Sequence, residues 1–281
     1  MDDEKDNEEP RAQLGRGDCK YFVNQSLDYM DISLKITVIT AGYNSEKTVG
    51  EAIASVAAQT HPDIEHLIIE GKSEDGSLVS IERAAHDRMA LVSEPDTGIY
   101  DALNKGIARA TGDVVGFLHS DDFFSHEGVL ARIAAAFEDQ SVEAVFSDLD
   151  YVSNADSGRV VRYWTTGPFS PGRLKWGWMP AHPTLYLRRS VYERIGSFDT
   201  SFRIAADYDF ILRYFSQTTK HSVYIPEVFY KMRLGGESNR DLRRIKRKSL
   251  EDYRAIRRNG VGGLLTLMVK NLSKLGQFLP R

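Results

Sequence analysis

The chain has little of what marks several common protein classes. It has one cysteine, Cys19, which rules out a disulfide framework and a cysteine-rich metal site and indicates a reducing, cytoplasmic setting. No stretch of about 18 apolar residues is present, so the sequence predicts no membrane-spanning helix. The acidic segment Met1–Pro10 lacks the apolar run of a signal peptide.

An excess of positive charge is also absent. The chain has 36 Lys and Arg against 40 Asp and Glu, a formal net charge of −4. Nucleic-acid-binding domains are usually strongly basic, so we expect no nucleic-acid partner. The two common phosphate-binding loops are missing too, because no GxGxxG follows the first predicted strand and no GxxxxGK[ST] occurs.

What the sequence does contain is a regular alternation of strands and helices. Its 281 residues are enough for one large α/β domain. Apolar, β-branched runs predict strands at 34–40, 64–69, 89–92 and 114–118. Helical spacing of apolar residues predicts helices from Ser45, at 99–110 and at 127–137. This alternation is typical of βαβ units around a parallel sheet.

Beyond about residue 140 the pattern is less regular and favours a mixed region. We predict strands at 143–152, 160–164, 183–187, 223–225 and 228–232, and helices at 190–195, 206–215 and 240–258. The expected organisation is a disordered polar leader (1–33), a main domain (34–239, with halves 34–140 and 141–239), and basic and amphipathic C-terminal helices (240–281).

The stretch Gly112–Asp122, GDVVGFLHSDD, is the most informative one. Its apolar run predicts a buried strand that ends at Asp121 and Asp122, and ligands of open α/β sheets bind at the carboxyl ends of the strands. Two adjacent carboxylates resist ionising together unless a cation is present, and Mg²⁺ takes carboxylates together with phosphate oxygens. A turn or a helix cap is the alternative interpretation, and both stay open at this point.

Several motifs in a fixed order resemble those of glycosyltransferase family 2. They are ITAGYN (39–44), IIEGKSEDGS (68–77), SEPDTGIYDALNKGIARATGD (93–113), SDD (120–122), PAHPT (180–184), GSFDTSFRIAADYDFILR (196–213) and GGES (235–238). The third motif is similar to the subgroup of colanic acid and other exopolysaccharide transferases. The resemblance covers about residues 34–240 and implies a GT-A fold. This is an α/β fold with a Rossmann-like, mostly parallel sheet, helices on both faces and a smaller mixed region on the acceptor side.

The resemblance also implies an activity. It implies an inverting, metal-dependent hexosyltransferase that moves a sugar from a UDP-, GDP- or dTDP-sugar to a hydroxyl of a glycan or lipid-linked acceptor in polysaccharide biosynthesis. By position, Asp122 is similar to the ligand of a divalent Mn²⁺ or Mg²⁺, and Asp121 to the residue that holds the donor ribose or a metal-bound water. Asp207 matches the catalytic base, which removes a proton from the acceptor hydroxyl.

The resemblance assigns the remaining site residues to two groups. The nucleotide-sugar would contact Asp121 together with Thr40, Tyr43, Asn44, Glu70, Asp96, Asp101 and Asn104. The acceptor or the diphosphate would contact His182, Trp178, Arg233 and Ser238. For Trp178 a plain core role is the alternative, and we expect His119 to be a packed residue at the strand end.

Two departures from the family pattern keep alternatives open. Glu70 stands where an Asp is usual, and Ala206 stands where a Glu usually precedes the base. A catalytically silent sugar-nucleotide or glycan-binding protein is therefore one alternative, and a sugar-1-phosphate nucleotidyltransferase is another. For residues 240–281 the two interpretations are contact with an anionic membrane surface on the cytoplasmic face and a solvated helix packed on the domain.

Overall fold

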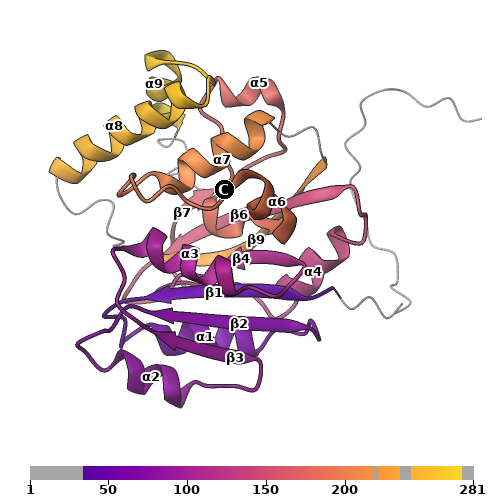
Figure 1. Cartoon of the computed structure of the whole chain (residues 1–281), viewed down its shortest axis with the longest axis vertical. Helices are drawn as coiled ribbons and strands as arrows, with labels where there is room; N and C mark the ends of the chain where they lie inside the picture. The colour runs from indigo at the N-terminus through magenta and orange to yellow at the C-terminus, as the bar shows by residue number, and fades with distance from the viewer. Residues whose placement is uncertain (1–33, 218–220, 235–241, 274–281) are drawn as a thin grey trace, which may run out of the picture. The chain divides into compact units, whose positions relative to one another are not determined.

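The computed structural model describes residues 34–217, 221–234 and 242–273 (Figure 1). The predicted polar leader (1–33) and the GGES loop (235–238) lie outside these ranges. Within them, no helix is both long enough and apolar enough to cross a membrane.

Four parallel strands form the first half of the sheet, as predicted. β1 (Ile36–Gly42), β2 (Ile64–Glu70), β3 (Met89–Ser93) and β4 (Val114–Phe117) lie in the order β3-β2-β1-β4. The chain therefore builds outward from β1 in one direction and then returns to its other side. Such a reversal of strand order leaves a crevice at the carboxyl ends of the two central strands, here β1 and β4.

Helices cover both faces of this sheet because its strands are apolar on both sides. In β1, Ile36 and Val38 pack on the side of α1 (Val49–Ala57) and α4 (Val129–Ala136). The intervening residues of β1 pack on the other side, as the two-residue period of a strand requires. Further helices are α2 (Ser77–Arg83), next to α1, and α3 (Ile99–Arg109), α6 (Arg189–Ile195) and α7 (Ala206–Gln217) on the side opposite α1.

The second half of the sheet is mixed. Beyond β4 the order continues β8-β6-β9-β5, with β7 also paired to β6, which gives nine strands in the described part of the chain. The bounds are β5 (Phe123–Phe124), β6 (Val142–Val152), β7 (Val160–Trp164), β8 (Tyr186–Arg188) and β9 (His221–Arg233). β7 and β8 run antiparallel to β6, whereas β9 runs parallel to it.

Two strand predictions in this half were wrong. The predicted strand 183–187 begins as a 3-10 turn, η1 (His182–Thr184), and only Tyr186–Arg188 forms a strand. The two short strands predicted at 223–225 and 228–232 are one strand, β9, whose register skips two residues after Ile225. Pro226 has no backbone N–H to donate to the neighbouring strand, which explains the interruption of the strand pairing. The same proline made the sequence look like two separate strands. β5 and the short helix α5 (Pro171–Leu174) were not predicted.

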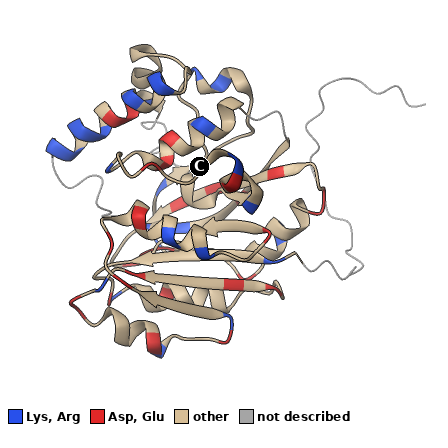
Figure 2. Cartoon of the chain, in the orientation of Figure 1, with Lys and Arg blue, Asp and Glu red and all other residues tan. Residues whose placement is uncertain are grey.

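The C-terminal helices pack on the same core as α7. α8 (Leu242–Arg258) confirms the predicted basic helix, and Figure 2 shows Lys and Arg along its length. α9 (Leu264–Ser273) lies within the predicted amphipathic segment, which continues beyond the described residues. Ala255 and Ile256 of α8 are fully buried in a cluster that includes α7 residues. α8 is therefore anchored to the domain on one side and charged on the other.

Candidate active site

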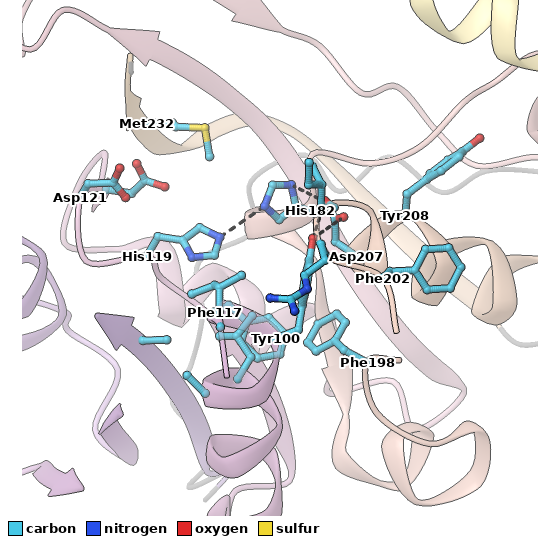
Figure 3. Close-up of a pocket in the computed structure, with 18 of the residues that line it drawn as sticks. Tyr100, Phe117, His119, Asp121, His182, Phe198, Phe202, Asp207, Tyr208 and Met232 are labelled. Atoms are coloured by element: carbon cyan, nitrogen blue, oxygen red, sulfur yellow. Dashed lines mark hydrogen bonds and ion pairs between the residues drawn. The ribbon is translucent and has the colours of Figure 1, made fainter. Parts of the chain in front are cut away.

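A cleft of about 1140 Å³ opens at the carboxyl ends of β1 and β4, where the strand order reverses. The loops after these strands line it, together with the turn before α3, the start of α7 and residues of α8 and α9. Figure 3 shows Asp121 on one side, Asp207 and Tyr208 on the other, and His119 and His182 between them.

The two adjacent carboxylates fit a divalent cation. Asp122 is fully buried, and its Oδ1 accepts a hydrogen bond from the backbone N–H of Arg233 (3.2 Å), whereas Oδ2 has no hydrogen-bond partner among the described residues. Burial and the charge of Asp121 raise the pKa of Asp122 well above its usual range. A hard cation with phosphate oxygens would neutralise this pair. No group of three or more His, Cys, Asp or Glu suited to a metal occurs in the described residues, so further ligands would come from substrate or water.

Arg233, predicted to contact the diphosphate, holds this carboxylate turn. Its Nη1 donates to the backbone oxygen of Asp121 (2.8 Å), and its Nη2 forms an ion pair with Glu51 of α1. The guanidinium carbon lies 5.0 Å from the centre of the Phe123 ring. Arg233 lines the cleft, and its contact with a diphosphate stays a prediction. Ser238 lies outside the described residues.

The loop after β1 brings Tyr43 and Asn44 to the cleft. The Tyr43 side chain is 57% exposed, which leaves an aromatic face open for a base. Asn44 adopts a left-handed conformation (φ 49°), and its side-chain oxygen accepts a hydrogen bond from the backbone N–H of Glu74 (3.0 Å). The backbone N–H of Asn44 donates to Ser73 Oγ (2.9 Å). The loops after β1 and β2 are thus joined by hydrogen bonds.

Asp96 and Asp101 line the cleft and also shape the turn before α3. Asp96 Oδ1 accepts from the N–H of Gly98 (2.8 Å), and Asp101 Oδ2 accepts from the N–H of Thr97 (2.9 Å). Gly98 has φ 133°, which favours glycine. A Cβ on Gly71 would overlap the carboxylate of Asp96, so only glycine allows this close approach. Both carboxylates therefore combine a turn role with a place at the cleft.

Thr40 and Glu70 were predicted to contact the nucleotide, but neither lines the cleft in the structure. Both side chains instead form hydrogen bonds within the protein, beneath the loops. Thr40 is fully buried, and its Oγ1 lies 3.0 Å from Nε2 of His66. Glu70 is also fully buried and accepts hydrogen bonds from the N–H of Ser73 and the hydroxyl of Ser93, both at 2.5 Å. Burial alone would raise the pKa of Glu70, but these hydrogen bonds lower it. In the structure, Glu70 supports the loop after β2.

Asn104 and Trp178 also lie away from the cleft lining. Asn104 exchanges two hydrogen bonds with the backbone of Phe198, at 2.9 and 3.0 Å, and so joins α3 to the loop before α7. Trp178 is 7% exposed and donates its indole N–H to the backbone oxygen of Thr166 (3.0 Å). Its ring packs in the hydrophobic core. The placement of Trp178 matches the core interpretation rather than an acceptor platform.

Asp207, the predicted base, lies at the start of α7 and is held from two sides. The Tyr100 hydroxyl is 3.0 Å from its Oδ1 and 2.6 Å from the backbone oxygen of Ile204. On the other side, Oδ2 lies 3.4 Å from Nδ1 of His182, whose Nε2 is 3.3 Å from Nε2 of His119. Burial and the charge of Asp207 raise the pKa of Tyr100 well above its usual range, so this hydroxyl stays protonated as a donor.

A second carboxylate on α7, Asp209, points elsewhere. It is fully buried, accepts a hydrogen bond from the Asn259 side chain (3.0 Å) and lies 3.7 Å from Nε of Arg213. This is the arrangement expected of residues two apart on a helix, about 200° around its axis. Only Asp207 of the two lines the cleft.

α8 supplies a support for Asp207 that the sequence did not reveal. The Glu251 carboxylate accepts hydrogen bonds from the backbone N–H groups of Arg203 (3.2 Å), Ile204 (2.8 Å) and Ala205 (3.0 Å). These amides lead directly into α7, where a carboxylate is favoured by the helix dipole. Glu251 therefore fixes the segment that carries Asp207.

Three residues near Asp207 were not predicted to belong to the site. Tyr100 lies inside the SEPDTGIYDALNKG motif, where its position among the carboxylates was an available signal. His119 was expected to be a packed residue, and it lines the cleft. Glu251 stands in a strongly basic helix, and no local pattern distinguishes it from a solvated acidic residue.

Comparison with known proteins agrees with this architecture. A family model described as "Glycosyl transferase family 2" matches residues 37–205, more than half of the chain. The chain belongs to glycosyl transferase family 2. A relative named glycosyltransferase Rv1514c, from Mycobacterium tuberculosis, is 33% identical over 181 residues, which is 63% of this chain and 68% of the relative.

Two known structures share the GT-A fold. Staphylococcus aureus TarS 1–349 in complex with UDP-GlcNAc matches 81% of this chain and 66% of its own, with a TM-score of 0.63 and 20% identity. The match to the longer TarS chain spans 39% of that chain's length. The mannosyltransferase PcManGT from Pyrobaculum calidifontis, in complex with GDP-Man and Mn²⁺, matches 84% of this chain and 68% of its own, with a TM-score of 0.61 and 19% identity.

Proposed function

We propose that the protein is an inverting, metal-dependent glycosyltransferase that transfers a sugar from a nucleotide-sugar to a hydroxyl of a glycan or lipid-linked acceptor. The observation that carries this proposal is the shared cleft of Asp207 and the Asp121-Asp122 pair (Figure 3). A base on one side and a cation-binding carboxylate pair on the other suit an in-line displacement, with the acceptor attacking from the side opposite the leaving diphosphate.

On the donor side, the chain would bind and orient the nucleotide. Tyr43 offers its exposed ring to the base, and Asp96 and Asp101 present carboxylates to the ribose or the sugar. Asp122 and Asp121 would hold Mn²⁺ or Mg²⁺. When bound, the cation would stabilise the negative charge that develops on the leaving nucleoside diphosphate.

On the acceptor side, Asp207 would take the proton of the attacking hydroxyl. Tyr100 donates toward Oδ1, which leaves Oδ2 as the oxygen that faces His182 and the cleft. His182, 32% exposed at its side chain, is placed to orient the acceptor hydroxyl against Asp207. Positioned proton transfer of this kind typically contributes a factor of 10² to 10⁴ in rate.

The finer assignments follow from the resemblance of the motifs. We propose a role in polysaccharide biosynthesis, close to the exopolysaccharide transferases, with residues 34–140 holding the nucleotide-sugar and 141–239 serving the acceptor. The Mn²⁺ and GDP-Man complex of PcManGT and the UDP-GlcNAc complex of TarS support the donor class and the metal.

We also propose that the protein acts at the cytoplasmic face of a membrane through its C-terminal helices. Leu264, Leu265 and Met268 of α9 are between 62% and 65% exposed, next to the basic helix α8. Apolar and cationic side chains together favour anionic lipid headgroups. Leu265→Glu should reduce sedimentation with phosphatidylglycerol liposomes, and unchanged sedimentation would contradict this contact. Point substitution is needed because truncating α8 would also remove Glu251 from the site.

The proposed activity is tested by donor-dependent transfer in matched variants. Asp207→Asn should abolish measurable transfer while nucleotide binding persists, since the residue acts on the acceptor. Asp209→Asn, on the same helix but buried against Asn259, is the control and should retain transfer. Equal activity of wild type and Asp207→Asn would reject the assignment of the base. Nucleotide binding without transfer to any acceptor in the wild type would instead favour a silent binding protein.

A further inference from the structure

The two ends of the cleft carry opposite charge. Beside the reversal of strand order, the cleft is lined by the carboxylates of Asp96, Asp101, Asp121 and Asp122. It is also lined by Arg203, Arg244, Arg247, Lys248 and Lys270, which we call the basic end. Figure 3 shows Tyr208 and Phe202 beyond Asp207, away from Asp121.

Contacts place the basic end next to these two aromatic residues. The ammonium of Lys270 lies 3.5 Å from the centre of the Tyr208 ring. Lys270 and Lys248 both pair with Oδ2 of Asp252, at 2.7 and 3.0 Å, and Arg203 follows Phe202 in the chain. Arg244, Arg247 and Lys248 are three and four residues apart, so they share one face of α8.

The basic end is a built feature rather than a solvated charged surface. Lys270 is 2% exposed and Asp252 is 1% exposed, although lysine is rarely buried without a reason. Asp252 Oδ1 is buried with no hydrogen-bond partner among the described residues. Among the described residues that line this part of the cleft, Asp252 therefore stands with five cations, two of which it pairs with. The chain as a whole has the opposite balance, with a net charge of −4.

The position of the basic end relative to Asp207 indicates which substrate it faces. In the proposed function the donor diphosphate lies with a cation at Asp121 and Asp122, and the acceptor hydroxyl lies at Asp207. Cations beyond Asp207 are then on the acceptor side. Several cations from separate segments suit a phosphate group, whose oxygens accept charge-assisted hydrogen bonds and match the planar fork of arginine.

We propose that the basic end binds a phosphate group of the acceptor, so that the substrate which receives the sugar is phosphorylated. The proposal rests on the proposed function for the placing of donor and acceptor. The phosphate belongs either to a lipid-linked diphosphate or to a soluble phosphorylated glycan. In both, Arg244 and Arg247 hold the anionic group while the hydroxyl reaches Asp207.

The test measures phosphate binding apart from the donor site. Inorganic pyrophosphate is titrated calorimetrically into the full chain in EDTA, which prevents metal-bridged binding at Asp121 and Asp122. The double variant Arg244→Ala/Arg247→Ala should bind pyrophosphate about tenfold more weakly than wild type. Lys246→Ala, an exposed cation of α8 that does not line the cleft, is the control and should bind within about twofold of wild type.

A second titration, of UDP, GDP and dTDP with Mn²⁺, separates this proposal from the proposed function. Nucleotide binding should be the same in the double variant and in wild type. A parallel loss of nucleotide binding would overturn the proposal, because the cations would then serve the donor. Absence of pyrophosphate binding in wild type, or equal binding in the double variant, would also overturn it. Pyrophosphate binding without nucleotide binding in wild type would support the phosphate site and reject the proposed function.

A third arm distinguishes the two sources of phosphate. Farnesyl diphosphate in phosphatidylcholine vesicles is compared with pyrophosphate and with plain phosphatidylcholine vesicles. Tighter binding to farnesyl diphosphate than to pyrophosphate, lost in the double variant, supports a lipid-linked acceptor. Equal affinities, again reduced in the double variant, support a soluble phosphorylated glycan.

Discussion

The acidic and basic ends of the cleft are assembled in different ways. The acidic end comes from the loops after β3 and β4 and from the first turn of α3, and Asp96 and Asp101 each accept a hydrogen bond from the backbone of the turn before α3. The basic end brings together the segment before α7, one face of α8 and Lys270 of α9. Parallel strands place their carboxyl ends at one edge whatever else the chain does, whereas the basic end exists only if α8 and α9 dock. This difference predicts that a substitution can impair one end of the cleft while the function of the other end is kept.

Among changes that keep Asp207 and Asp122 in place, the largest effect is expected from removing the link between α8 and Asp207, the proposed base. Glu251→Ala leaves three amides before α7 without their acceptor, so Asp207 loses its position and kcat should fall by about tenfold to a hundredfold. The KM for the donor should change little, because the acidic end does not depend on α8. Steady-state kinetics check this split. Glu251→Gln should restore part of the rate, and a matched loss of donor affinity would contradict the separation.

A smaller loss is expected from the hydroxyl that holds Asp207. Tyr100→Phe keeps the ring beside Phe198 but removes the donor to Oδ1, so kcat should fall by about tenfold. Tyr192→Phe is the matched control, because the buried Tyr192 hydroxyl has no hydrogen-bond partner among the described residues. The control should keep the wild-type kcat. Similar kinetics for the two variants would show that Tyr100 acts only through packing.

A substitution at the acidic end should in turn leave Asp207 in place. In Gly71→Ala the new Cβ overlaps the Asp96 carboxylate and meets the Tyr43 ring at 3.3 Å, so nucleotide affinity should fall by about fivefold, or ~1 kcal/mol. Calorimetry measures this loss. Gly50→Ala is the control, since nothing lies within 4 Å of its Cβ and helical alanine is favourable. Equal nucleotide affinity in both variants would contradict the role of this contact.

The last effect concerns the stability of the sheet beneath the acidic end rather than binding or rate. Burial, then His86 and Arg88, lower the pKa of His66 to about 3. Between pH about 6.5 and about 3 the unfolded chain binds a proton that the folded chain does not, so the free energy of unfolding falls as pH falls. His66 contributes a slope of at most about 1.4 kcal/mol per pH unit.

Urea unfolding at pH 7.5 and 5.5 tests this contribution. His66→Gln should show a smaller difference between the two pH values than wild type. His221→Gln, a change at an exposed histidine, is the control and should keep the wild-type difference. An unchanged pH dependence in His66→Gln would contradict the assignment.

The same contrast explains what the sequence could predict. The strands, the helices of the first half and the place of the Asp121-Asp122 pair follow from local patterns of apolar residues and turns. Thr40 and Glu70 stand at comparable positions in the sequence, yet His66, Ser73 and Ser93 engage them below the loops. The local pattern of apolar and polar residues shows where a strand ends. It does not show whether each side chain at that end points into the cleft or into the protein.

Long-range packing accounts for the rest. Glu251 lies 44 residues after Asp207, and its role depends on how α8 docks against the start of α7. The ion pair of Asp252 and Lys270 also depends on long-range packing. In the sequence Asp252 belongs to the basic segment and Lys270 to the amphipathic one, and in the structure they are buried together. For Trp178 the sequence left a platform and a core role open, with the core role favoured, and in the structure Trp178 packs in the core.

The central claim is that Asp121 and Asp122 bind a nucleotide-sugar through a divalent cation, and calorimetric titration of UDP, GDP and dTDP with and without Mn²⁺ tests it most directly. The account predicts that one nucleotide binds tightly only with Mn²⁺ and that Asp122→Ala abolishes this binding. Asp113→Ala, at the amino end of β4 where Asp113 accepts from the N–H of Lys35, should keep it. Failure of all three nucleotides to bind, or equal binding with and without Mn²⁺, would contradict the account.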